Sequence, residues 1–280
     1  MGGAAPPDRL TWERVSPFLG GLRLGAFIHL DEVGSTNGYA RSLSLDEGCP
    51  PPEGAAVVIA ESQTEGRGRL GRAWVTCPGK SIALSVLIRR DADSGEDPLL
   101  ALAAACFVAQ AIESCCCVSA MIKWPNDVVA EGKKICGILA ETVRRPGADD
   151  RLIVGIGINA NLDEIDFPPS IRGVATSLKL ILGAAVDRGR VVAETLRALI
   201  DGLATRACER FANGSPLREY YDAHCVDIGR EVVATHGGES LRAVALGISE
   251  GGGLIVELPG GGRRELYSGE ASIRGVCGYV

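Results

Sequence analysis

The sequence predicts an α+β fold in which a mixed sheet covered by helices is followed by a small all-β domain. Short apolar runs of strand length recur through the first part of the chain, separated by turns rich in Gly, Asn, Asp and Pro and by stretches with helical spacing. After Cys225 the pattern changes to short β runs divided by groups of glycines. We therefore expect a loosely held tail at 1–22, a main domain at 23–224 and a β domain at 225–280.

The elements of the main domain follow in chain order. Apolar runs predict strands at 26–30, 56–61, 81–88, 120–124, 135–142 and 152–159. A helix is expected after the capping residues that begin at Ser35, and Asp97-Pro98 supplies an N-cap and a first-turn proline for a helix that runs through Glu113. Helical spacing of apolar residues predicts a further helix from Val186 to about Phe211. A mixed sheet with helices on one face fits this order.

Composition excludes several classes of protein. The chain has 280 residues and a net charge of −6, which does not favour binding to the phosphate backbone of nucleic acid. The longest apolar stretch, 99–112, is too short to span a bilayer, and the first residues do not form a secretory signal, so we expect a cytoplasmic protein. The 10 cysteines form no C-x-x-C pair and the 3 histidines are scattered, which favours reduced thiols over disulfides or a zinc site.

A segment that alternates glycine with arginine, ESQTEGRGRLGRAW at 61–74, is the densest chemical signal. Glycine lets the backbone approach a ligand closely, and arginine binds carboxylate and phosphate oxygens through two donors at once. A flexible surface loop with solvated arginines is the alternative interpretation. Three of the five lysines fall within 123–134, and an ammonium can neutralise a phosphoryl or acyl oxygen.

Two further segments carry polar residues beside turns. In Trp124-Pro125-Asn126-Asp127, Asp127 could accept a hydrogen bond from a ribose or help to hold a divalent cation, although a simple proline turn explains the pattern equally well. The segment VGIGINAN at 154–161 lacks the third glycine and the helix start of a dinucleotide-binding fingerprint. Its small residues would permit close packing under a ligand, with Asn159 as a donor.

Six motifs in this order resemble those of the biotin protein ligases: Ser35-Thr36-Asn37, Gln63 with GRGRLGRAW, KWPND, GKKICGILAE, GIGIN and GEASIR. The resemblance covers about residues 27–275. It implies a class II synthetase-like catalytic domain followed by a small SH3-like β-barrel, in agreement with the change of pattern near Cys225. It also implies a form without the N-terminal DNA-binding domain that some relatives carry.

The same resemblance assigns roles to individual residues. The residues implied in biotin binding are Ser35, Thr36, Asn37, Gln63, Gly66, Arg67, Gly68, Arg69, Lys134 and Gly137. Those implied in ATP binding are Arg69, Arg72, Trp74, Lys123, Asn126, Asp127, Lys134, Asn159 and Arg274, with Asp127 also a candidate ligand of Mg²⁺. Lys134, Arg69 and Lys123 are the implied catalytic residues, Lys134 first, whereas Lys133 is interpreted as a solvated surface charge.

The implied reaction joins biotin to ATP as biotinyl-5′-adenylate, with release of pyrophosphate. Biotin then passes to the ε-amine of a lysine on a biotin carboxyl carrier domain. Arginine, lysine and Mg²⁺ would offset the repulsion between carboxylate and phosphate, and the Gly/Arg loop would shield the adenylate from water. A homodimer is possible because relatives form one.

Three other functions are considered. A lipoate or octanoate ligase would share the adenylate chemistry, but the polar residues at 35–37 and Gln63 suit the ureido ring of biotin better than a linear apolar chain. A biotin-sensing repressor would need a DNA-binding module, for which about 25 residues before the first strand are too few. A protein that binds biotin without activating it would not need Arg67, Arg69, Lys123, Asp127 and Lys134 together.

Overall fold

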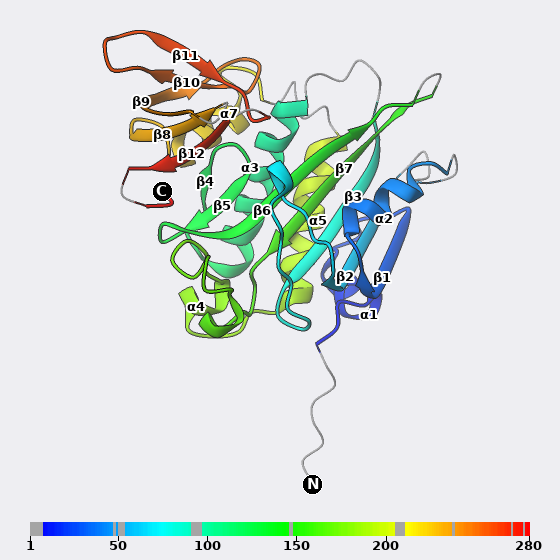
Figure 1. The fold of residues 1–280 in the computed structure, drawn as a ribbon. Helices are drawn as coiled ribbons and strands as arrows, with labels where there is room; N and C mark the ends of the chain where they lie inside the picture. The colour runs from blue at the N-terminus through cyan, green and yellow to red at the C-terminus, as the bar shows by residue number, and fades with distance from the viewer. Residues whose placement is uncertain are drawn as a thin grey trace.

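Two β-sheets, the larger one with helices packed against it, make up the computed structural model of the protein (Figure 1). The structure describes residues 8–46, 49, 54–90, 97–145, 148–204, 211–236, 239–269, 271–276 and 278–280. The predicted α+β fold, with a mixed sheet followed by an antiparallel β domain, is confirmed.

The larger sheet has 7 strands in the order β1-β2-β3-β7-β6-β5-β4. Their bounds are β1 Ala26–Val33, β2 Ala56–Gln63, β3 Ile82–Arg90, β4 Met121–Lys123, β5 Asp127–Ala130, β6 Lys133–Val143 and β7 Asp150–Ile158. Strands β1 and β2 pair in parallel and all other neighbours are antiparallel, so the sheet is mixed. The short strand β5 was not predicted, because its four residues follow a proline turn and show no pattern of their own.

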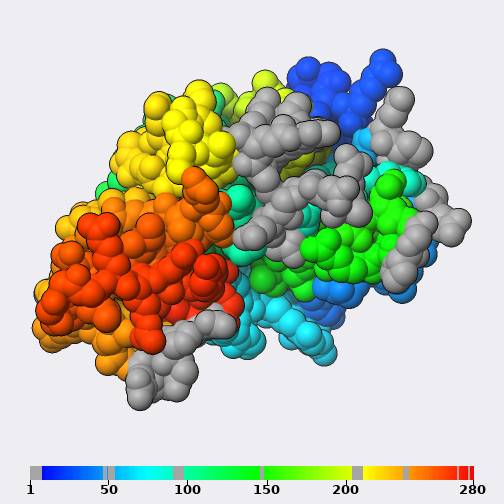
Figure 2. Space-filling view, turned by 90° about the horizontal axis from the view of Figure 1, so that it is seen from above, coloured from blue at the N-terminus to red at the C-terminus, as the bar shows by residue number. Residues whose placement is uncertain are grey.

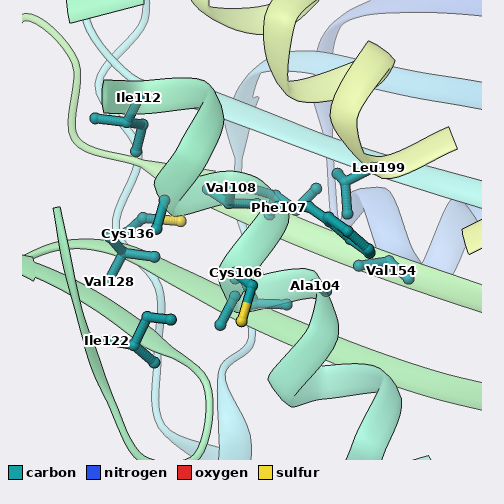
Figure 3. Close-up of a cluster of buried hydrophobic side chains, with 14 of the residues drawn as sticks. Ala104, Cys106, Phe107, Val108, Ile112, Ile122, Val128, Cys136, Val154 and Leu199 are labelled. Carbon is teal, nitrogen blue, oxygen red and sulfur yellow. The ribbon is translucent and has the colours of Figure 1, made fainter. Parts of the chain in front are cut away.

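Helix α3, Asp97–Cys116, and helix α5, Arg188–Ala204, pack against each other and against the same face of the larger sheet. Figure 3 shows Phe107 of this helix together with Val154 of the sheet and Leu199 of α5. Gly202 makes room for the Phe107 ring, which a Cβ at that position would overlap. Helix α3 is long and apolar enough to cross a membrane, but buried core helices meet the same criteria of length and composition. Its buried side chains form the centre of the core here.

The prediction that the helices lie on one face is wrong for α2, Thr36–Leu43. This helix packs on the opposite face, where its Ala40 joins a separate apolar cluster with Val58, Leu87 and Ile153. Alternate residues of a strand point to opposite faces, so Val57 and Ile59 face α3 and α5 while Val58 faces α2. Both faces are therefore partly covered.

Residues 10–19 differ from the loosely held tail predicted for 1–22. They form α1, Trp12–Val15, and a 3₁₀ turn, Ser16–Phe18, and Leu10, Val15 and Leu19 are buried in the core. The backbone N–H of Leu10 also donates to Glu61 Oε1 at 2.7 Å. The Pro- and Gly-rich composition of the first residues hid these apolar contacts from the sequence pattern. Residues 1–7 lie outside the described part of the chain.

Two short helices were not predicted, α4 at Leu178–Leu182 and α7 at Pro216–His224. Each begins at a serine whose side chain caps it, Ser177 and Ser215. The helix predicted from Val186 to about Phe211 corresponds to α5, which ends at Ala204; residues 205–210 lie outside the described residues.

The smaller sheet has 5 antiparallel strands in the order β11-β10-β9-β8-β12. Their bounds are β8 Glu231–His236, β9 Glu239–Ile248, β10 Leu254–Glu257, β11 Arg263–Leu266 and β12 Ala271–Gly275. Figure 2 shows these strands, in orange and red, at one end of the molecule. They are joined to the larger sheet by buried contacts, among them the Trp124 indole N–H, which donates to the Gly252 carbonyl at 3.1 Å.

Candidate active site

A cavity of about 620 Å³ lies over the face of the larger sheet that carries α2, and the C-terminal β domain closes one side of it. All the residues that the sequence predicted for the site line this cavity except Gly66. The lining also includes residues 166–168 and 170–171, 173–175, Ser272, Ile273 and Tyr279, none of which was predicted. Segments far apart in the sequence therefore meet at one place.

The Gly/Arg loop folds back on itself at the mouth of the cavity. The Trp74 N–H donates to the Gly66 carbonyl at 2.8 Å, and the Gly68 N–H donates to the Arg72 carbonyl at 2.7 Å. A Cβ at Gly66 would overlap the Trp74 carbonyl oxygen, so this crossing requires glycine. Gly66 thus shapes the loop and does not line the cavity. At the tip of the loop, Leu70 has a left-handed φ of 55° and is largely exposed.

The Arg69 guanidinium belongs to this loop and forms part of the cavity wall. Its Nη1 donates to Asn126 Oδ1 at 3.1 Å, whereas its Nη2 is buried and has no hydrogen-bond partner among the described residues. Burial lowers the pKa of Arg69, although the nearby Asp127 carboxylate acts in the opposite direction. A buried donor without an acceptor is costly, and an anionic ligand in the cavity would satisfy it.

Lys134 and Asp127 form an ion pair inside the cavity. Lys134 Nζ lies 2.5 Å from Asp127 Oδ1, and its side chain is 25% exposed. The same ammonium stands 5.4 Å from the centre of the Trp74 ring. The Tyr279 hydroxyl donates to the other oxygen of Asp127, and burial together with this carboxylate raises the pKa of Tyr279.

The Asp127 carboxylate does not fit the role of a resident magnesium ligand. Both of its oxygens already contact donors of the protein, Lys134 and Tyr279. Mg²⁺ is usually held by one or two carboxylates together with substrate phosphates and waters. Across the residues that the structure describes, no group of three or more Asp, Glu, His or Cys side chains could hold a metal ion.

Other predicted residues line the cavity but use their polar atoms on the protein itself. Lys123 is buried and its Nζ lies 3.0 Å from Asp227 Oδ1. The Asn159 side chain donates to the Thr176 carbonyl at 3.1 Å, and the Asn126 side chain donates to the Ile138 carbonyl. These contacts fix the walls of the cavity, so the direct binding roles of these side chains remain predictions.

The predicted biotin end of the cavity is polar and rests on two glycines of β7. Gln63 Oε1 accepts from both the N–H and the hydroxyl of Thr36, at 2.8 and 3.1 Å. Gly155 gives room to the Asn37 side chain, which also donates to Glu141 Oε2 at 2.7 Å. Ser35 caps α2 by accepting from the Gly38 N–H.

Gly157, the second of these glycines, seats the indole of Trp74, whose ring would overlap a Cβ there. The Trp74 Nε1 is buried without an acceptor among the described residues. The glycines of the GIGIN motif therefore accommodate protein side chains that line the cavity, whereas close packing beneath a ligand stays a prediction.

Tyr279 is one of the lining residues that the sequence interpretation missed. Nothing near it marks a site, because its importance depends on how the last residues fold back. The one local signal is the pair of glycines, Gly275 and Gly278, which face each other in an isolated β-bridge next to the C-terminus. The loop at 166–175 was missed for a similar reason: its Val174 carbonyl accepts from the backbone N–H of Lys134 at 2.8 Å, a contact that no sequence pattern shows.

Two protein-family models match this chain, one after the other along the sequence. Residues 35–159 match the model of the biotin/lipoate A/B protein ligase family, and residues 227–274 match the biotin protein ligase C-terminal domain. The bifunctional ligase/repressor BirA of Bacillus spizizenii is 33% identical over 88% of this chain and 73% of its own length. The biotin–[acetyl-CoA-carboxylase] ligase of Mycobacterium tuberculosis is 34% identical over 76% of each chain.

Solved structures agree with the sequence relatives. The biotin protein ligase of Aquifex aeolicus in complex with biotin and ATP superposes with a TM-score of 0.71 at 31% identity, over 89% of this chain and 98% of that one. The biotin protein ligase of Leishmania major, at 22% identity and a TM-score of 0.55, shows the fold alone. With both domain models matched in order and relatives above 30% identity along most of its length, the chain belongs to the biotin protein ligase family.

Proposed function

We propose that this protein is an ATP-dependent biotin protein ligase. It activates biotin to biotinyl-5′-adenylate and then transfers biotin to the ε-amine of a lysine on a biotin carboxyl carrier domain. The observation that carries the proposal is the cavity itself, where a polar pocket at Thr36 and Gln63 continues into a wall that holds the Arg69 guanidinium and the Lys134 ammonium.

In the first step a carboxylate oxygen of biotin attacks the α-phosphorus of ATP, and the bond from that phosphorus to the bridging oxygen of pyrophosphate breaks. Two anions must approach and negative charge grows on the leaving group. Fixed cations in a partly buried site stabilise that charge more strongly than water does. We assign this task to Lys134 and to Arg69, whose buried Nη2 has no acceptor within the described part of the chain; Arg67, Arg72 and Arg274 also line the cavity.

In the second step the lysine amine of the acceptor attacks the acyl carbon, the bond to the phosphate oxygen breaks, and AMP leaves while the amine loses a proton. The protein needs no nucleophile of its own for this transfer. Its task is to keep the mixed anhydride away from water, and the Gly/Arg loop at the mouth of the cavity supports that role.

Mg²⁺ fits this scheme as part of the substrate. Because each Asp127 oxygen contacts a donor of the protein, we assign no resident metal ligand and propose that the ion arrives bound to the phosphates of ATP. When bound it would reduce the charge on those phosphates. Lys134 and Arg69 would orient the remaining oxygens.

The acceptor that we propose is a carrier domain of a biotin-dependent carboxylase, as the names of two relatives from Mycobacterium tuberculosis and Paracoccus denitrificans suggest. We propose the cytoplasm as the compartment, which the free thiols of the described cysteines support. We propose neither nucleic acid nor a membrane as a partner. A homodimer is a separate hypothesis, which sedimentation of the purified protein would test.

Transfer is tested with the purified protein, biotin, Mg·ATP and a recombinant carrier domain. The expected result is a carrier mass increased by one biotinyl group at one lysine. The matched control is a carrier whose acceptor lysine is replaced by arginine, which should stay unmodified. A carrier that gains a lipoyl or octanoyl group instead, when those acids are offered, would assign the protein to the lipoate branch of the same family.

A further inference from the structure

The last residues of the chain reach back into the active-site cavity. Strand β12 ends at Gly275, which forms an isolated antiparallel bridge with Gly278. A Cβ at Gly275 would overlap the carbonyl carbon of Val280, so the chain can fold back this tightly only because Gly275 has no side chain. The result is that Tyr279, one residue from the C-terminus, lines the cavity.

Tyr279 contacts the charged residues of the site from two sides. Its hydroxyl donates to Asp127 Oδ2, and its ring centre lies 5.3 Å from Lys123 Nζ. The other oxygen of Asp127 holds Lys134 at 2.5 Å. Tyr279, Asp127 and Lys134 therefore form a chain of contacts from the C-terminus to the cation that we assign to adenylate formation.

These contacts matter because the Lys134 ammonium is paired with the Asp127 carboxylate. To stabilise an anionic substrate oxygen, its ammonium must share or leave the Asp127 carboxylate, and Asp127 is then left close to further negative charge. A donor that stays on Asp127 lowers the cost of that exchange, because a hydrogen bond to a carboxylate is among the stronger ones in proteins. Burial and the carboxylate raise the pKa of the phenol, which favours its role as a hydrogen-bond donor.

We propose that Tyr279 is a positioning residue for adenylation, which holds Asp127 in place so that Lys134 is available to the reacting carboxylate and phosphate. The proposal rests on the proposed function and deepens it. In this proposal the C-terminal β domain does more than line the cavity, because the Tyr279 hydroxyl positions a charged residue of the catalytic site.

The test is Tyr279→Phe, which removes one oxygen atom and keeps the ring in place. Biotin-dependent exchange of pyrophosphate into ATP is measured with purified full-length protein. We expect kcat to fall about ten- to one-hundred-fold, the loss that corresponds to one hydrogen bond to a charged group, while KM for biotin changes less than about twofold. Tyr267→Phe, in the same β domain but outside the cavity lining, is the matched control and should keep the wild-type kcat.

A double-mutant cycle with Asp127→Asn separates positioning from a general loosening of the domain. If Tyr279 acts through Asp127, Tyr279→Phe should cost less than about threefold in the Asp127→Asn background, because the carboxylate that it holds is gone. Equal losses in both backgrounds, or an unchanged kcat in Tyr279→Phe, would overturn the proposal. Lack of biotin-dependent exchange in the wild-type protein would instead refute the proposed function.

Discussion

Replacement of Lys134 by alanine tests the assignment of the main cation. Its Nζ is held 2.5 Å from Asp127 and its side chain is 25% exposed, so it sits in a partly desolvated wall of the cavity. Loss of one preorganised group that stabilises charge in the transition state typically costs 10²- to 10³-fold in kcat, or about 3–4 kcal/mol. We expect this loss in biotin-dependent pyrophosphate exchange by Lys134→Ala.

The same substitution should change stability little. Partly exposed ion pairs contribute up to about 1 kcal/mol, and Asp127 would keep its hydrogen bond from Tyr279. Urea unfolding should therefore show a decrease of about 1 kcal/mol or less in the free energy of unfolding. Lys133→Ala is the matched control, since this neighbouring lysine is exposed and outside the cavity, and it should keep full activity. Exchange by a folded Lys134→Ala within about threefold of wild type would contradict the assignment.

Three further substitutions test the framework of the site. Gly157→Ala would force a Cβ into the Trp74 indole. We expect a loss of about 1–3 kcal/mol in the free energy of unfolding and a shift in tryptophan fluorescence. Unchanged stability and fluorescence would show that the indole does not pack on Gly157. Asp227→Asn leaves the buried Lys123 ammonium without a counter-charge, so chemical denaturation should show a loss of about 3–5 kcal/mol in the free energy of unfolding. A loss below about 1 kcal/mol would mean that the pair is not buried in solution. Burial opposes ionisation of Glu61, but a backbone N–H and a neighbouring guanidinium outweigh it and lower the pKa. This carboxylate therefore contributes stability above its unfolded pKa of about 4.3, and that contribution is lost as the pH falls through the lower folded pKa. Glu61→Gln should flatten the acid limb of a stability profile, and identical limbs would contradict the account.

Most of the fold could be predicted because its elements have clear periodicity. The strands near Ile59, Leu84 and Val154 alternate or run apolar over more than five residues, and Ser35 and Asp97 mark helix starts by known capping chemistry. The elements that were missed are short or depend on distant partners. Strand β5, for instance, has four residues and is defined by its pairing with β4 and β6.

The candidate site shows the same division between local and distant information. Motifs in the sequence located the residues that line one cavity, but they did not show what each polar atom contacts. Lys123 and Asn159 satisfy protein groups, whereas Arg69 keeps a buried N–H without an acceptor among the described residues. In both cases the motif marks the residue as polar and close to the site, and only the three-dimensional neighbours separate a structural role from a binding one.

Biotin-dependent exchange of labelled pyrophosphate into ATP is the measurement that tests the central claim most directly. The purified protein is assayed with Mg·ATP and biotin, and in parallel with lipoate, with octanoate and with no acid. We predict exchange with biotin and none above background with the other two acids. Exchange with lipoate or octanoate alone would move the protein to the sister branch of the family, and no exchange with any acid would contradict the claim that it activates biotin.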